Sequence, residues 1–213
     1  EALRKRLRTD RRVITIDDYG AGGGGNKNKR SVSSIARRSL KPKKYASLVA
    51  RIAGYLRPQR VIELGTSLGV TTAYIARACP EASIETLEGS PEIAAIAGDH
   101  FAALGINNIR VVTGSFDNTL PAILCNTTTV NFAFVDGNHR KAPTLTYFHW
   151  LAERCLPESV LVFDDIHWSR EMEAAWREIT RHPAVTCSID LFFLGIVFFR
   201  KEFREPQHFI IRY

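Results

Sequence analysis

The chain has 213 residues, of which 45% are hydrophobic, which is enough for one domain with a sizeable buried core and an appendage. This composition excludes a chain that is disordered as a whole, and no apolar run is long enough to span a membrane as a helix. The charged first residues do not resemble a secretory signal, so we expect a soluble, cytoplasmic protein. The four cysteines show no C-x-x-C spacing, which argues against a zinc site and against a disulfide framework.

The net charge of +7 is unevenly distributed along the chain. Residues 1–60 contain 17 basic and 4 acidic residues, whereas residues 61–213 contain 12 basic and 18 acidic residues. A basic N-terminal arm can attract a nucleic acid, an anionic surface or an acidic small molecule. It can equally fold over the acidic remainder and neutralise it, and the charge pattern leaves both alternatives open.

The first predicted elements surround a glycine-rich stretch, GAGGGGNKNKRS, from Gly20 to Ser31. The strand-like VITID precedes it, and the spacing of Gly20 and Gly25 matches a P-loop, but Asn26 stands where that motif requires lysine. The stretch therefore predicts a flexible flap rather than a nucleotide loop, followed by a short helix in SVSSIARRS.

We interpret residues 1–44 as a basic arm with this flap, and residues 45–213 as a ligand-binding domain. One hypothesis is that the flap closes over the substrate, where Lys27, Lys29 and Arg30 favour an acidic acceptor. The alternative is a disordered segment without a role.

The domain itself reads as a parallel sheet with crossover helices. KPKKYASLVARIAGYLRP has helical spacing, and five strand patterns follow in VIEL, SIETLE, IRVVTG, NFAFVD and SVLVFDD, with helical stretches between them. The helical pattern WSREMEAAWREITRH then leads to two apolar runs, AVTCSIDLF and LGIVFFRKEF, whose short link predicts an antiparallel hairpin. The fold class is therefore α/β, with a seven-stranded, mostly parallel sheet, a C-terminal antiparallel hairpin and helices on both faces.

Ligands of open parallel sheets bind outside the carboxyl ends of the strands. After the first of these strands, ELGTSLG lacks the glycine pattern of a dinucleotide loop, and Glu63 would repel a pyrophosphate. A carboxylate there would instead attract a positively charged ligand, such as S-adenosylmethionine with its ammonium and sulfonium groups. Glu88, at the end of the second strand, is placed to accept hydrogen bonds from two ribose hydroxyls.

Four segments together, ELGTSLG, TLEGSPE, VTGSF and FVDGNH, resemble class I S-adenosylmethionine-dependent methyltransferases over about residues 45–200. FVDGNH and VLVFDDIHW are similar to the catechol and caffeoyl-CoA O-methyltransferase branch. The resemblance implies a Rossmann-like methyltransferase sandwich that transfers a methyl group from S-adenosylmethionine to a small-molecule hydroxyl with the help of a metal. The candidate cofactor-binding residues are Glu63, Gly65, Thr66, Ser67, Gly69, Glu88, Gly114, Ser115 and Asp136.

The same resemblance implies a metal site and a base. Carried over by position, Asp136, Asp164 and Asp165 become candidate ligands of Mg²⁺ or another divalent cation, with Asp165 standing where the branch has asparagine. The lysine of the branch is replaced by His139, which together with Asp136 forms the candidate catalytic pair. A bound cation would lower the pKa of the acceptor hydroxyl, and His139 would take its proton.

Other interpretations stay open at this point. The three aspartates could bind no metal, His139 could be a surface residue, and His167 and Trp168 could line a substrate pocket or belong to the core. The basic arm could direct the enzyme to RNA, although no N-P-P-Y-like motif or aromatic RNA-binding signature supports this. A further alternative is a non-catalytic binding protein with a methyltransferase-like fold. An NAD-dependent oxidoreductase is disfavoured by Ser67 and Glu63. A homodimer is expected only by analogy with the family.

Overall fold

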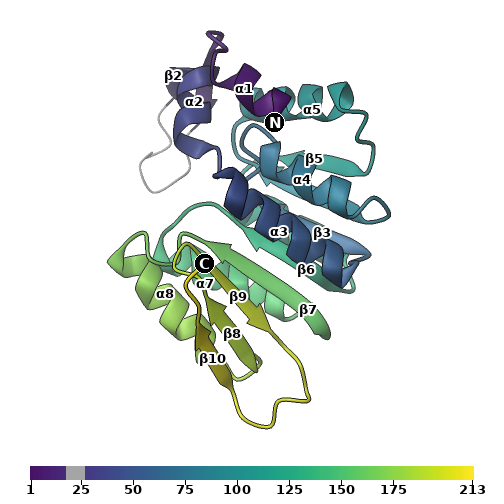
Figure 1. Cartoon of the computed structure of the whole chain (residues 1–213), viewed down its shortest axis with the longest axis vertical. Coiled ribbons are helices and arrows are strands. Elements are labelled where there is room, and N and C mark those ends of the chain that lie inside the picture. The colour runs from purple at the N-terminus through teal and green to yellow at the C-terminus, as the bar shows by residue number, and fades with distance from the viewer. Residues whose placement is uncertain (18–26) are drawn as a thin grey trace.

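A computed structural model describes residues 1–17 and 27–213 of the chain. Its main feature is an eight-stranded sheet with the strand order β10-β8-β9-β7-β6-β3-β4-β5 (Figure 1). The strands of this sheet are β3 Arg60–Leu64, β4 Ser83–Glu88, β5 Ile109–Thr113, β6 Val130–Val135, β7 Cys155–Asp164, β8 Cys187–Asp190, β9 Leu194–Phe198 and β10 Gln207–Ile210. The α/β class expected from the sequence is confirmed.

The sheet combines a parallel half with an antiparallel hairpin, as predicted. Strands β3 to β7 pair in parallel with their neighbours, whereas β9 is antiparallel to both β7 and β8. All seven expected strands are present, and β10 adds an eighth that pairs in parallel with β8 at the edge. The sequence analysis missed β10, a strand of only four residues that follows a charged segment.

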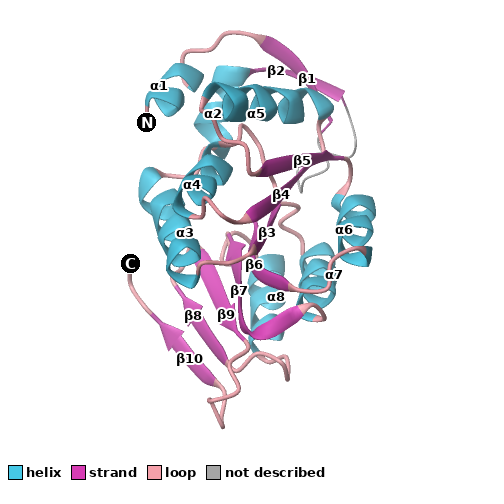
Figure 2. Ribbon diagram, turned by 90° about the vertical axis from the view of Figure 1, so that its right-hand side faces the viewer, coloured by secondary structure: helices cyan, strands magenta, loops and turns pink. Residues whose placement is uncertain are grey.

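Helices cover both faces of the sheet (Figure 2). One face is packed by α3 and α4, whose residues Val49, Ala53 and Ile75 form a buried cluster with the strands. The other face is packed by α6, α7 and α8 through residues such as Leu124, Phe148 and Trp176. The helices of this domain are α3 Lys43–Leu56, α4 Val70–Ala78, α5 Pro91–Ala103, α6 Phe116–Cys125, α7 Lys141–Ala152 and α8 Arg170–Thr180.

One boundary differs from the sequence-based expectation. The stretch APTLTYFHWLAERCL, which ends at Leu156, is one of the predicted helical stretches between the strands, but α7 ends at Ala152 and β7 begins at Cys155. Pro157 explains the difference, because proline removes a backbone donor and keeps the preceding residue, Leu156, in an extended conformation.

The N-terminal segment forms a layer of its own against α4 and α5, at the top of Figure 1. It contains α1 Ala2–Leu7, which was not expected, the antiparallel pair β1 Val13–Asp17 and β2 Lys27–Ser31, and the expected short helix α2 Val32–Ser39. The glycines from Gly20 to Gly25 lie outside the described residues. No helix in the described part of the chain is long and apolar enough to cross a membrane.

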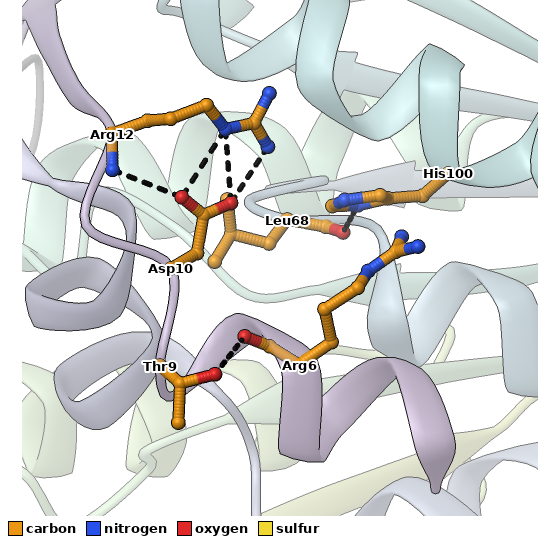
Figure 3. A network of polar contacts seen from close by, with 6 residues as sticks. All are labelled: Arg6, Thr9, Asp10, Arg12, Leu68 and His100. Carbon is orange, nitrogen blue, oxygen red and sulfur yellow. Dashed lines mark hydrogen bonds and ion pairs between the residues drawn. The ribbon is translucent and has the colours of Figure 1, made fainter.

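Polar contacts fix the described part of this segment to the domain; from here on, the arm means residues 1–17 and 27–39. The backbone N–H of Thr15 donates to Glu92 of α5 at 2.9 Å. Within the arm, the Arg12 guanidinium pairs with Asp10, and Arg6 of α1 lies beside His100 of α5, whose Nδ1 is 3.0 Å from the Leu68 carbonyl oxygen (Figure 3). The arm is therefore placed precisely enough to contribute side chains to the domain.

Candidate active site

A cavity of about 790 Å³ opens at the carboxyl ends of β3, β4, β6 and β7 and extends to α2 and the start of α3. This is the place that an open parallel sheet provides for a ligand. Most of the residues predicted from the sequence lie on its walls, namely Gly65, Ser67, Glu88, Ser115, Asp136, His139, Asp164 and Asp165. Glu63, Thr66, Gly69 and Gly114 do not line it.

Glu88 is held rigidly at the end of β4. Its Oε2 accepts the Ser67 N–H at 2.8 Å, and its Oε1 accepts the Ser90 N–H at 3.0 Å. Burial raises the pKa of Glu88, although these backbone hydrogen bonds act in the opposite direction. Each carboxylate oxygen keeps a further lone pair, so the group can accept two hydroxyl hydrogen bonds from a ligand.

The glycines of ELGTSLG allow two loops to pack backbone against backbone. Gly65 has φ of 100°, and a Cβ added there would lie 2.0 Å from the carbonyl oxygen of Asp136. The N–H of Asp136 in turn donates to the Leu64 carbonyl at 2.8 Å. At Gly69, an added Cβ would meet the ring of Phe101 at 2.7 Å. Gly65 thus shapes the cavity directly, and Gly69 serves the packing of α4 against α5.

Glu63 is fully buried and has a different role from the predicted one. Its Oε2 accepts hydrogen bonds from the hydroxyls of Thr72 and Thr86, both at 2.5 Å, and its Oε1 has no protein partner. Burial raises the pKa of Glu63 to about 8, against the effect of these two hydrogen bonds. Thr66 is tied into the same group, because its hydroxyl lies 2.7 Å from that of Thr86. Glu63 thus acts inside the protein, on two threonine hydroxyls, and not on the wall of the cavity.

Lys41 joins the acidic side chains at the ends of β6 and β7. Its Nζ lies 3.3 Å from Asp136 Oδ2 and donates a hydrogen bond to Asp164 Oδ2. The side chains of Lys41 and Asp164 are 9% and 5% exposed, so this ion pair is shielded from solvent. Burial lowers the pKa of Lys41, but the aspartates more than offset this and raise it above its usual value.

The charges within this cluster shift the two carboxyl groups in opposite directions. Although burial raises the pKa of Asp136, Lys41 and His139 lower it below its ordinary value. For Asp164, burial and the neighbouring Asp136 raise the pKa well above its ordinary value despite Lys41. Asp136 therefore carries the negative charge of the pair, and Asp164 is the carboxyl group that gains a proton more easily.

The predicted three-aspartate metal site does not fit these positions. A divalent cation would need carboxylate oxygens at about 2.0 to 2.6 Å, and the Lys41 ammonium already lies between Asp136 and Asp164. No group of three His, Cys, Asp or Glu side chains that could hold a metal occurs within residues 1–17 and 27–213. We therefore derive no chemistry through a metal at this site.

His139 lies beside Asp136, the other member of the candidate catalytic pair. Its Nε2 is 3.7 Å from Asp136 Oδ1, and its backbone has φ of 28° in the loop that follows β6. The side chains of both residues are about a quarter exposed, at 24% and 22%. The pair is thus accessible from the cavity, which a proton-accepting group requires.

Another part of the cavity wall is a hydrogen-bonded network that was not expected from the sequence. The Tyr147 hydroxyl donates to Asp117 at 2.8 Å and accepts from Asn138 at 3.0 Å, and Arg140 donates to Asn138 at 2.8 Å. Burial raises the pKa of Tyr147 to about 12, with a further upward contribution from Asp117. Tyr147 is therefore a neutral structural hydroxyl, and the network fixes the loop that carries His139.

Aromatic residues border the mouth of the cavity. Trp168 lines it and is 70% exposed, which favours a pocket wall over a core position for this residue. Tyr45 and Phe193, also on the lining, have their ring centroids 5.2 Å apart. His167, by contrast, is absent from the lining, and its Nε2 lies 2.8 Å from Asp190.

Comparisons with known proteins agree with this geometry. Residues 62–166 match the methyltransferase domain family. Catechol O-methyltransferase from Mycobacterium tuberculosis is 29% identical over 117 residues, covering 54% of this chain and 51% of that protein. Catechol O-methyltransferase from Niastella koreensis is 28% identical over 126 residues, covering 58% and 55%. The matched part of the chain thus spans about half the length of these curated relatives.

A structural neighbour extends the likeness in fold. The crystal structure of the O-methyltransferase from Bacillus cereus, in complex with S-adenosylhomocysteine, superposes with a TM-score of 0.66 at 19% identity. The superposition covers 76% of this chain and 83% of that chain. The likeness confirms the Rossmann-like methyltransferase sandwich expected from the sequence.

Proposed function

Residues 62–166 belong to the methyltransferase domain family, and on this premise we propose that the chain is an S-adenosylmethionine-dependent O-methyltransferase of a small molecule. The observation that carries the proposal is the cavity in which the rigid Glu88 and the pair of Asp136 and His139 line the same space. It provides both a hydroxyl-binding carboxylate and a proton acceptor. The similarity to catechol O-methyltransferases supports a hydroxyl of the catechol type as the acceptor.

The chain's own residues fit the cofactor. Glu88 offers two oriented carboxylate oxygens for ribose hydroxyls, and Gly65 lets the loop after β3 pack against the backbone of Asp136 on the cavity wall. When bound, S-adenosylmethionine supplies an electrophilic methyl group on a sulfonium. Ser67 and Ser115 add polar groups on the lining, whereas Glu63 acts indirectly by holding Thr72 and Thr86 beneath the loop.

His139 is the proposed base. In-line transfer forms a bond between the acceptor oxygen and the methyl carbon, and the bond from that carbon to sulfur breaks with its electron pair left on sulfur. The hydroxyl proton passes to Nε2 of His139, and Asp136 stabilises the imidazolium that results. Asp136 is therefore a positioning residue for His139 as well as part of the cavity wall.

The charge of the lining favours an acidic acceptor. Arg30 and Arg38 of the arm and Arg140 after β6 contribute to the cavity walls together with Lys41. A carboxylate or phosphate on the acceptor would be attracted to these groups, with Trp168 and Phe193 available for an apolar ring. A homodimer, a cytoplasmic location and the division at residue 44 stay predictions from the sequence.

Calorimetric titration of S-adenosylmethionine tests the cofactor site, with NADH as the competing cofactor class. We expect binding of S-adenosylmethionine and none of NADH. Glu88→Gln should weaken the affinity by at least about 10-fold, because it removes charge-assisted hydrogen bonds, while the exposed Glu81→Gln should leave it unchanged. Mass-spectrometric detection of a methylated catechol carboxylate then tests the reaction. A protein that binds NADH and not S-adenosylmethionine would refute the proposal.

A further inference from the structure

Lys41 is the one cation that contacts two acidic strand ends of the cavity among the described residues. Its ammonium donates a hydrogen bond to Asp164 Oδ2 and lies 3.3 Å from Asp136 Oδ2. It also lies 5.6 Å from the ring centre of Phe134. It precedes Pro42, the N-cap of α3, and therefore comes from the basic segment of the chain rather than from the sheet. Nothing in the sequence motifs of the strand ends points to it.

We infer that the ammonium of Lys41 replaces a divalent cation in this enzyme and binds the acceptor oxygen during methyl transfer. The claim that Lys41 binds the acceptor oxygen rests on the proposed function. The claim that Lys41 replaces a metal does not, because it depends only on where Lys41 lies: its ammonium occupies the space between the two carboxylates that a metal would need to share.

The coordination chemistry supports this exchange of one cation for another. A metal bound to both aspartates would lie closer to Asp136 than the Lys41 ammonium does, and it would repel that ammonium at close range in a site shielded from solvent. Asp165 directly follows β7, where its N–H donates to the Phe193 carbonyl at 2.7 Å and its backbone has φ of 54°. It lines the same cavity, and its negative charge contributes to the raised pKa of Asp164.

An ammonium in this position has donor capacity left for a substrate. Lys41 carries three N–H groups, and the two aspartates account for two of them. The third can donate to the acceptor oxygen, and the positive charge favours the negative charge that develops on that oxygen as it loses its proton. The ammonium itself gains and loses no proton in the reaction.

The arm contacts the backbone of Lys41 and so helps to hold this residue in place. The buried Arg4 of α1 donates from Nη1 to the Lys41 carbonyl oxygen at 2.6 Å. Helix α2, which directly precedes this segment, packs on the domain, with Val32, Ile35 and Ala36 in the same cluster as Leu68 and Val70. The basic arm thus has a specific task in addition to its charge, namely the delivery of one lysine to the acidic strand ends.

Two measurements on the wild-type protein test the inference. Calorimetric titration of Mn²⁺ should show no binding up to millimolar concentration, and methyl transfer should proceed unchanged in excess EDTA. Mn²⁺ binding that Asp164→Asn abolishes, or activity that EDTA removes and Mg²⁺ restores, would overturn it. The Mn²⁺ titration does not depend on turnover, so it remains decisive even if the proposed function is wrong.

Variants of Lys41 complete the test. Lys41→Met should lower kcat by about 100-fold, as expected for loss of a charged group at the reacting oxygen, with S-adenosylmethionine affinity unchanged. Because it frees Asp136 and Asp164, it should also acquire Mn²⁺ binding that the wild type lacks. Lys41→Arg keeps the charge and should retain more activity, and the exposed Lys43→Met should behave as wild type. A Lys41→Met protein with full kcat would contradict the role in catalysis.

Discussion

The cavity has two halves that are assembled in different ways. The half that we propose for the cofactor consists of Gly65 and Ser67, on the loop that follows β3, and Glu88 at the end of β4, and the hydrogen bond from Ser67 to Glu88 links residues about 20 positions apart. The acceptor half brings Lys41 from before α3 to Asp136 and Asp164, across 95 and 123 positions. Backbone geometry fixes the first half, whereas buried charges and the docked arm fix the second.

Because the two halves are held in place differently, substitutions in them should have different effects. A change in the cofactor half should damage folding and cofactor binding together, because the loop of Gly65 packs on the backbone of the next strand end. A change in the acceptor half should leave the sheet intact and alter turnover, because Lys41 depends on contacts made by the arm. Four substitutions test this contrast.

Gly65→Ala should have the largest effect. The new Cβ would lie 2.0 Å from the Asp136 carbonyl oxygen at a residue with φ of 100°, so the backbone must move. We expect a loss of more than about 4 kcal/mol in the free energy of unfolding, measured in urea, or no folded protein. Gly98→Ala in α5 is the matched control, because nothing lies within 4 Å of its added Cβ. It should be stabilising by about 1 kcal/mol, and equal damage by both substitutions would contradict the argument.

Glu63→Gln should make the protein less sensitive to alkaline pH. The folded-state pKa of about 8 is higher than the unfolded value, so the folded protein binds more protons. Wild-type stability should therefore decline as the pH rises through this range, by up to about 1.4 kcal/mol per pH unit between about 4.5 and 8. In thermal unfolding from pH 5 to 9, the Tm of the variant should increase relative to that of the wild type as the pH rises.

The exposed Glu81→Gln provides the control for that experiment, because it changes the same chemical group without burial. If both variants follow the wild-type pH profile, the buried Glu63 carries no titration penalty. That result would weaken the view that buried contacts fix the cofactor half, because Glu63 holds Thr72 and Thr86 beneath the loop that follows β3.

The positions of the strand-end residues could be predicted from the sequence better than the position of Lys41, for a physical reason. Strand periodicity places Glu88 and Asp136 at carboxyl ends, and parallel strands necessarily bring those ends to one edge. The motif ELGTSLG likewise predicts that Gly65 lies in the turn after its strand. What failed was the assignment of Glu63 as an attractor of positive charge, because alternation along a strand does not reveal that its side chain turns into the core and is used by two threonines.

Lys41 could not be read from local patterns. It is one of three lysines in KPKK, and only the docking of α1 and α2 distinguishes it from Lys43 and Lys44. A weak signal was available, since three acidic residues near two adjacent strand ends need a counter-charge when buried. The resemblance suggested a metal for that task, and the tertiary structure instead provides a lysine. The eighth strand, β10, was missed because four residues give too little periodicity.

Arg4→Met should separate the two halves by kinetics. Removing the guanidinium takes away the hydrogen bond to the Lys41 carbonyl, so the ammonium should be held less precisely. We expect kcat to fall by about 10-fold, as displaced catalytic groups lose part of their orientation, with the dissociation constant of S-adenosylmethionine within 2-fold of wild type. Arg8→Met, which changes an exposed arginine next to the same helix, is the control. Weaker cofactor binding in Arg4→Met would mean that the arm supports both halves.

Trp168→Ala should have the smallest effect and should define how far the acceptor half extends. Trp168 lines the cavity but is 70% exposed, so it can cover only part of a bound acceptor. We expect the acceptor KM to rise by about 3-fold, equivalent to about 0.6 kcal/mol of lost apolar contact, with kcat and cofactor affinity unchanged. Phe209→Ala, an exposed aromatic position on β10 outside the lining, should leave the acceptor KM unaltered. An unchanged KM in Trp168→Ala would restrict the acceptor to the space between Lys41 and His139, and the aromatic mouth would then belong to the entrance and not to the binding site.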